Sequence, residues 1–345
     1  MPVSIARWYR RERLDLTVEF VTPAFLGNWE QKSELRAAPF KALLRYWWRV
    51  AEGHQYDTPD ALYRAETVLF GSAGDGGQSL AHIVVTGKPA YTTDLPRVNE
   101  LEIARGSGKK MPVHPWLYLG YGKVKRQDGV IVIRPEFGAV KAGERFQLTM
   151  IGSSSVLERL RPTIGVVSLF GAVGGRSRNG WGGIHLSEQN GGAFIRNPRV
   201  SWSQWRQLLA HDYPCGVGCD EKGPLYWKLT GGPSPSWDEA LASLAEVYVR
   251  IRLSLPLNPP PNKRHLLGYP VKDHDVREWG NQRHAKSLRL LVRKEDSQYR
   301  GYVLHVPHRF ALSHPGIADE AVWSAVHHQL DQLLERSSVE NIEHA

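Results

Sequence analysis

The chain has few cysteines and lacks any long apolar run. Its two cysteines, Cys215 and Cys219, are too few for the disulfide framework of a small secreted protein. No apolar run approaches the roughly 20 residues that span a bilayer. The first residues, MPVSIARWYRRERLD, also lack the apolar centre of a signal peptide. We therefore expect a cytoplasmic protein that does not act at a membrane.

The common catalytic signatures are also missing. The sequence contains no G-x-S-x-G, no H-E-x-x-H and no Gly-Lys-Ser/Thr after its glycine-rich segment. That segment precedes a predicted strand, whereas a dinucleotide-binding fingerprint opens a helix. An NTPase or a Rossmann enzyme is therefore not expected, and we expect no cofactor.

Positive charge and aromatic rings are abundant. The net charge is +9, the isoelectric point is about 9.5, and there are 12 tryptophans and 13 tyrosines among 345 residues. An excess of cations favours anionic partners, and aromatic rings offer surfaces on which bases stack. With 41% hydrophobic residues, the chain has enough apolar mass for one large domain or two. Nucleic acid is the expected partner.

Residues 33–53 predict a helix with an apolar side and a basic side. Pro39 suits the first helical position and Gly53 suits the end. The apolar arc contains Phe40, Leu43, Leu44, Trp47, Val50 and Ala51. Cations recur at four-residue spacing, with a tryptophan at the edge of the stripe: Lys41, Arg45, Arg49 and Trp48. The stripe fits single-stranded nucleic acid, but it also fits an ordinary solvated helix face.

Periodicity in the first half predicts the order strand, helix, strand, strand, helix, strand. This is the βαββαβ order of a ferredoxin-like, RRM-like domain over residues 1–188. The predicted strands are 14–20, 82–86, 145–150 and 184–186, and residues 87–143 are a long insertion with a strand at 130–133. Pro162 either kinks the second helix or separates a short turn from residues 163–170.

The second half, residues 189–345, predicts another α+β domain. Helices are expected at 203–210, 237–247 and 317–334. Strands are expected at 248–255, 288–292 and 302–306, the first because Val249 and Ile251 alternate with Arg250 and Arg252.

A glycine-rich segment lies between the second helix and the fourth strand of the first domain. Residues 171–183 hold six glycines together with Arg176 and Arg178. Backbone N–H groups at Gly174 and Gly175 could approach a phosphate that the arginines pair with, although a flexible turn would look similar. A basic run at 281–293 contains Lys286, which either contacts phosphate or belongs to a charged turn.

Two weaker patterns bear on catalysis and metals. His54 follows the basic helix and could act as general base on a ribose 2′-OH, but no partner for it can be argued from sequence. His211, Cys215 and Cys219 have a spacing that could hold zinc, yet intervening glycine and proline oppose a helix and no fourth ligand follows. Reduced thiols and no metal are therefore expected.

Two segments resemble a CRISPR-associated family. TPAFLG at 22–27 and ELRAAPFKALLRYWWR at 34–49 are similar to the signature of RAMP proteins that form the first subunit of type III-B Cmr effector complexes. GRSRNGWG at 175–182 is similar to their glycine-rich segment. The resemblance covers residues 14–186 and is weak over 190–345. The chain departs from the pattern at Phe40, Ala42 and Asn28-Trp29.

This resemblance implies two ferredoxin-like domains, the second of them diverged, without nuclease chemistry. It implies a crRNA-guided complex for antiviral defence, in which the chain caps the assembly beside other RAMP subunits and contacts the 3′ side of crRNA or target RNA. The motif match carries over the RNA contacts Arg36, Lys41, Arg45, Trp48, Arg49, Arg176 and Arg178. The alternative is a RAMP endoribonuclease that processes crRNA with His54 as its base.

Overall fold

The first four-stranded sheet is organised around a strand in which alternate residues face the core. In β1 (Glu12–Phe20), Leu14, Leu16 and Val18 are buried, as their spacing predicts. The sheet is antiparallel in the order β10-β1-β9-β2. Its other strands are β2 (His82–Thr86), β9 (Arg145–Gly152) and β10 (Ile184–Glu188). The predicted βαββαβ element order of this half is confirmed.

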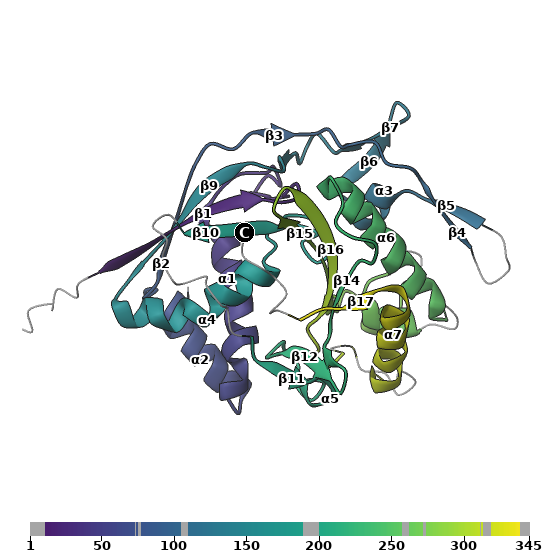
Figure 1. Ribbon diagram of the computed structural model, residues 1–345. Helices are drawn as coiled ribbons and strands as arrows, with labels where there is room; N and C mark the ends of the chain where they lie inside the picture. The colour runs from purple at the N-terminus through teal and green to yellow at the C-terminus, as the bar shows by residue number, and fades with distance from the viewer. Residues whose placement is uncertain are drawn as a thin grey trace, which may run out of the picture.

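Figure 1 shows a computed structural model of the chain. The structure describes residues 11–72, 74, 77–104, 110–188, 200–256, 262–271, 274–310, 312 and 319–338. The predicted domain boundary at 188/189 lies beside residues 189–199, outside the described residues, so the division stays a prediction. No helix among the described residues is long and apolar enough to cross a membrane.

Three helices form the layer on one side of the first sheet (Figure 1). They are α1 (Ala37–Glu52), α2 (Pro59–Phe70) and α4 (Ser154–Phe170), with a short 3-10 turn, η1 (Gly53–Gln55), after the first. Helices α1 and α4 lie against the strands, and α2 packs on α1. Helix α1 begins two residues before Pro39 and ends at Gly53 as predicted. Helix α4 is a single helix through Pro162, capped by the Ser153 side chain, so Pro162 does not divide it.

The insertion at 87–143 is more regular than expected. It holds short strand pairs and one helical turn: β3 (Tyr91–Thr92), β4 (Leu101–Ala104), β5 (Lys110–Val113), α3 (Pro115–Leu119), β6 (Val124–Gln127), β7 (Val130–Ile133) and β8 (Ala139–Val140). The predicted strand at 130–133 is confirmed. Trp116 is fully buried, with ring centroids 5.8 Å from those of Trp181 and Trp237. Trp116 therefore anchors the insertion in the hydrophobic core of the second unit.

The second unit repeats the strand arrangement of the first. Its sheet has the order β15-β16-β14-β17. When the four strands of each sheet are numbered along the chain, both sheets have the order 4-1-3-2, read from β10 in the first and from β17 in the second. Its elements are β14 (Tyr226–Lys228), α6 (Trp237–Ser254), β15 (Leu288–Glu295), β16 (Gln298–His305), α7 (Asp319–Leu333) and β17 (Glu335–Arg336). Smaller elements are β11 (Trp202–Gln204), α5 (Trp205–Leu208), β12 (Val217–Asp220), β13 (Gly223–Pro224), η2 (Lys263–Leu267) and η3 (Arg277–Trp279).

Two predictions in the second half are wrong. Residues 248–255 form the last turns of α6 rather than a strand, because the helical pattern of 237–247 continues without a breaker. Tyr248 and Ile251 are buried, whereas Arg250 faces outward and pairs with Glu246 one turn earlier. The helix predicted at 203–210 is reduced to the single turn of α5.

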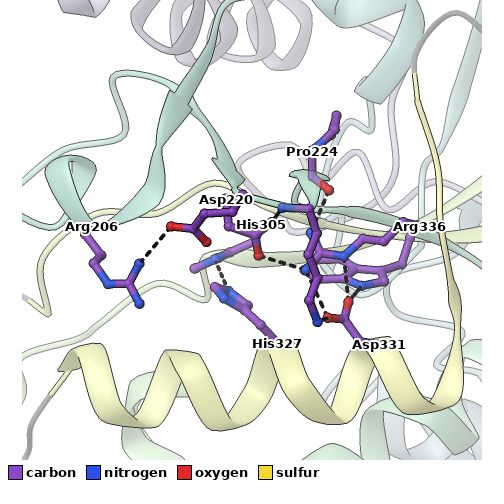
Figure 2. Close-up of polar contacts among 10 residues, drawn as sticks. Arg206, Asp220, Pro224, His305, His327, Asp331 and Arg336 are labelled. Carbon is purple, nitrogen blue, oxygen red and sulfur yellow. Dashed lines mark hydrogen bonds and ion pairs between the residues drawn. The ribbon is translucent and has the colours of Figure 1, made fainter.

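The last strand is held by a charged network, which Figure 2 shows. Arg336 donates to Asp331 and Asp220 and to the carbonyl of Pro224. Burial opposes ionisation of Asp331, but hydrogen bonds, that of Arg336 foremost, lower its pKa below the usual value. Beside this network, the rings of His305 and His327 share a hydrogen bond of 2.9 Å inside the core.

The two sheets meet where β10 lies beside β15. Arg293 of β15 is buried and donates to the carbonyl oxygen of Ile184 at 3.0 Å and to that of Ser168. Arg289 lies 4.2 Å from the ring centroid of Tyr46 on α1. Side chains of the second unit thus reach into the helical layer of the first.

Replacing Pro162 by Ala should stabilise the protein. Pro162 is exposed and interrupts the backbone hydrogen bonding of α4 from within, so Ala should raise the free energy of unfolding by roughly 1–3 kcal/mol. Urea denaturation followed by circular dichroism measures the change. The neighbouring control Arg161→Ala removes an exposed pair with Glu158 and should shift stability by less than about 1 kcal/mol. A loss of stability in Pro162→Ala would contradict this.

Candidate nucleic-acid interface

The glycine-rich loop packs against the loop that follows β1, so the two sequence motifs form one structure. The Gly175 N–H donates to the carbonyl of Phe25 at 2.8 Å, and the Gly182 N–H to that of Pro23 at 2.9 Å. The Thr22 hydroxyl accepts from the Gly183 N–H, also at 2.9 Å. Donors expected to cradle a phosphate at Gly175 are therefore engaged inside the protein, which corrects that part of the prediction.

Close approach explains why glycines are needed here. Gly174 and Gly182 have φ of +93° and +66°, which favour glycine. A Cβ added to Gly182 would lie 2.0 Å from the carbonyl oxygen of Val173, and one at Gly174 would lie 2.5 Å from that of Phe25. The loop is thus a rigid support for the two arginines that it carries, Arg176 and Arg178.

A groove of about 1140 Å³ opens beside this loop. Its walls come from the glycine-rich loop, the region of α3, helix α6 and residues 267–286. Its charged, histidine and tyrosine lining includes Tyr118, Tyr121, Arg176, Arg178, Tyr248, Arg252, Asp275, Arg283, His284 and Lys286. The groove therefore lies where the two units and the insertion meet.

The groove is strongly cationic. In the described part of its lining there are five basic side chains and a single carboxylate, that of Asp275; the basic ones are Arg176, Arg178, Arg252, Arg283 and Lys286. Among the described residues, none of the five forms an ion pair with a carboxylate. Three predicted contacts, Arg176, Arg178 and Lys286, are thus brought together. Arg252 was missed because its segment was predicted as a strand; helical spacing would have placed it one turn from Tyr248.

An exposed ring borders the cations. Tyr121 is 54% exposed, and the guanidinium carbon of Arg176 lies 5.8 Å from its ring centroid. By contrast, burial raises the pKa of Tyr118 to about 12, so that phenol stays neutral. Tyr121 therefore offers a stacking surface that the sequence did not reveal, since it lies in the insertion, far along the chain from Arg176.

Lys286 is a buried lysine that has no carboxylate partner in the described part of the chain. It is 9% exposed, and within the described residues its Nζ has no hydrogen-bond partner. Nζ lies 3.8 Å from the ring centroid of Tyr248, and the Lys286 carbonyl accepts from Arg178 Nη1 at 3.0 Å. Burial first, and then the charges of neighbouring arginines, lower the pKa of Lys286 well below its usual value.

The basic stripe of α1 faces α2 instead of the groove. Arg45 Nε lies 2.6 Å from Glu66 Oε1, and Arg49 Nη1 lies 2.9 Å from Glu66 Oε2. Arg36 donates to the carbonyl of Gly27, and Lys41 is half-buried. None of these four cations lines the groove. Their role as RNA contacts stays a prediction, and Arg45 and Arg49 share the single carboxylate of Glu66.

Trp48 is a core residue, so the expectation that its ring stacks on a base is wrong. It is 2% exposed, with its ring centroid 5.8 Å from that of Tyr56 and 6.3 Å from that of Phe70. Helix α2, which the sequence did not reveal, covers the side of α1 on which Trp48 lies.

The remaining candidates lie apart from the groove. His54 is exposed on η1 and borders a separate cavity of about 260 Å³. Cys215 is buried, and burial raises its thiol pKa to about 11. Among the described residues, which include His211, Cys215 and Cys219, no group of three or more His, Cys, Asp or Glu could hold a metal ion.

Comparison with known proteins agrees with the motifs. Residues 17–185 match the family model of the RAMP superfamily. The resemblance of this segment to RAMP proteins is thereby confirmed. The fold is similar to that of Cmr1 from Pyrococcus furiosus, with a TM-score of 0.50 and 16% identity over 92% of this chain and 97% of the other.

Weaker similarity extends to two structures of the type III-B Cmr-β complex bound to cognate target RNA. One chain has a TM-score of 0.48 and 11% identity, covering 93% of this chain and 98% of its own. The other also has a TM-score of 0.48, with 10% identity, covering 93% and 100%. No curated protein matches the sequence.

Replacing Gly182 by Ala should unfold the loop locally or destabilise the protein strongly. The added methyl would meet the Val173 carbonyl and impose a strained φ, so we expect a loss of at least about 3 kcal/mol. Gly129→Ala is the matched control, because Gly129 also has a positive φ but open space around it; about 1 kcal/mol is expected. Equal losses in thermal or urea denaturation would refute the packing role.

Proposed function

We propose that the chain is an RNA-binding subunit of a crRNA-guided type III CRISPR effector complex. The cationic groove beside the glycine-rich loop is the observation that carries this proposal, since its described lining holds five basic side chains and one carboxylate. The RAMP match over 17–185 and the Cmr1-like fold support the assignment to such a complex. Other RAMP subunits, crRNA and target RNA are the proposed partners, and the chain caps the assembly near the 3′ side of crRNA.

The groove suits a single strand better than a duplex. Arginine side chains bind phosphate oxygens through charge-assisted hydrogen bonds, and phosphates recur along any nucleic acid. Stacking on Tyr121, however, requires a base whose face is free, as it is in single-stranded RNA. The groove therefore combines phosphate contacts with one ring for a base, and none of its residues needs to act on a bond.

Neutralising a groove arginine should weaken RNA binding in a salt-dependent manner. Arg176→Gln and Arg283→Gln each remove one phosphate contact, so we expect affinity to fall roughly tenfold. The slope of log affinity against log salt should fall in magnitude by about 0.7 for a single strand. Fluorescence anisotropy with labelled single-stranded RNA at several salt concentrations measures both quantities.

Arg309→Gln is the matched control, because Arg309 is an exposed arginine paired with Asp212 outside the groove. Its affinity and salt slope should equal those of the wild type. If Arg309→Gln weakens binding as much as the groove variants do, binding is non-specific and the groove is not the site.

The alternative of an endoribonuclease predicts cleavage that depends on His54. His54 lines the separate small cavity and does not line the groove. We therefore expect labelled repeat RNA, incubated in EDTA, to stay intact with the wild type and with His54→Ala. Denaturing gel electrophoresis resolves the products. Site-specific cleavage by the wild type that disappears in His54→Ala would overturn the non-catalytic assignment.

A further inference from the structure

We propose that Lys286 holds its proton weakly in the free protein and binds it more firmly when an RNA phosphate enters the groove. The groove is then a proton-linked anion site, whose affinity for RNA depends on pH although the phosphodiester itself does not titrate. This inference rests on the proposed function and adds a property that ordinary surface cations do not have.

The position of the ammonium group makes Lys286 different from the other groove cations. Its Nζ has no hydrogen-bond partner among the described residues, and it lies over the face of the Tyr248 ring. An exposed ammonium would keep its water shell, whereas a buried one loses it. The arginines Arg176 and Arg178 are also partly buried, but a guanidinium keeps its proton in proteins. Lysine is therefore the group that can change charge here.

The groups that face Lys286 are almost all positive or neutral. Arg252 and Tyr248 come from α6, and Arg178 and Arg176 come from the glycine-rich loop. Arg289 lies at the start of β15, three residues after Lys286, and adds to the electrostatic repulsion. Each of these arginines lowers the affinity of Lys286 for a proton, in addition to the effect of burial.

The nearby histidines and the single acid do not offset this charge. Burial, His308 and Arg178 lower the pKa of His284 to about 3, and burial lowers that of His308 to about 4, so both rings are neutral near pH 7. Asp275 is exposed at the border of the groove and is the one carboxylate among the described residues of its lining. Within that part of the chain no carboxylate pairs with Lys286, so a bound anion is the counter-charge that we propose.

A phosphate supplies that charge. One negative charge among Arg178, Arg252 and Lys286 offsets the repulsion between them, and it favours the protonated form of Lys286. The proton comes from the buffer and is bound by Nζ, so the complex holds more protons than the separate partners. By linkage, affinity must then fall as pH rises through the range in which the bound lysine loses its proton.

Calorimetry on the full chain tests the inference. Titration with an oligouridylate of about ten nucleotides, whose bases and phosphodiesters do not titrate near neutral pH, is repeated in buffers with small and large ionisation enthalpies. The wild type should take up a proton, seen as a binding enthalpy that varies with the buffer. Its affinity should fall by up to about tenfold for each pH unit in the linked range.

Lys286→Met is the decisive variant, because it keeps the length of the side chain and removes no hydrogen bond of Nζ. It should still bind the RNA but without proton uptake and with a flat pH dependence. Lys228→Met, at a half-buried lysine outside the groove, and His284→Gln should both retain the uptake seen in the wild type.

The outcomes separate the inference from the proposed function. RNA binding by the wild type without proton uptake overturns the inference and leaves the proposed function standing. Uptake that persists in Lys286→Met, or that is lost in His284→Gln instead, also overturns it. Absence of any binding to single-stranded RNA overturns both.

Discussion

The junction between the two sheets depends on buried arginines that pair with no carboxylate among the residues that the structure describes. Arg293 is satisfied by two carbonyl oxygens of the first unit, and Arg289 lies over the rings of Tyr46 and Trp47. Arg178 reaches across in the opposite direction to the carbonyl of Lys286. Backbone carbonyls and aromatic faces lower the cost of burying these charges but do not cancel the charges themselves. The junction consequently leaves an excess of positive charge at its edge, where the groove opens.

The glycine-rich loop connects this junction to the groove. Its glycines let it lie directly on the loop after β1, which fixes the backbone of Arg176 and Arg178. The N–H of Leu290 in β15 donates to the carbonyl of Arg178, so the same residue is tied to the second sheet. Rigidity of the support reduces the entropy that the arginine side chains lose on binding. In this loop the glycines allow close packing, and the two arginines line the groove.

Much of this arrangement could be predicted from the sequence where the signal is local. Alternation in β1 and the order of strands and helices gave the first α+β unit, and the glycine-rich segment pointed to Arg176 and Arg178. The failures have a common cause. Trp48 could not be placed without knowing that α2 covers it, and Arg252 was assigned to a strand because a short alternation also occurs within α6. Tyr121 joins the groove only through the fold of the insertion.

Composition alone could not locate the functional charge. The net charge of +9 is spread over 44 basic and 35 acidic residues, and many exposed arginines are matched by a nearby carboxylate. On α1, the basic stripe has the clearest helical period, but two of its three cations, Arg45 and Arg49, pair with Glu66. The groove cations come from segments far apart in sequence, and they lack such partners among the described residues. Since a paired cation gains little from a phosphate, the uncompensated set is the one whose electrostatic energy a polyanion can lower.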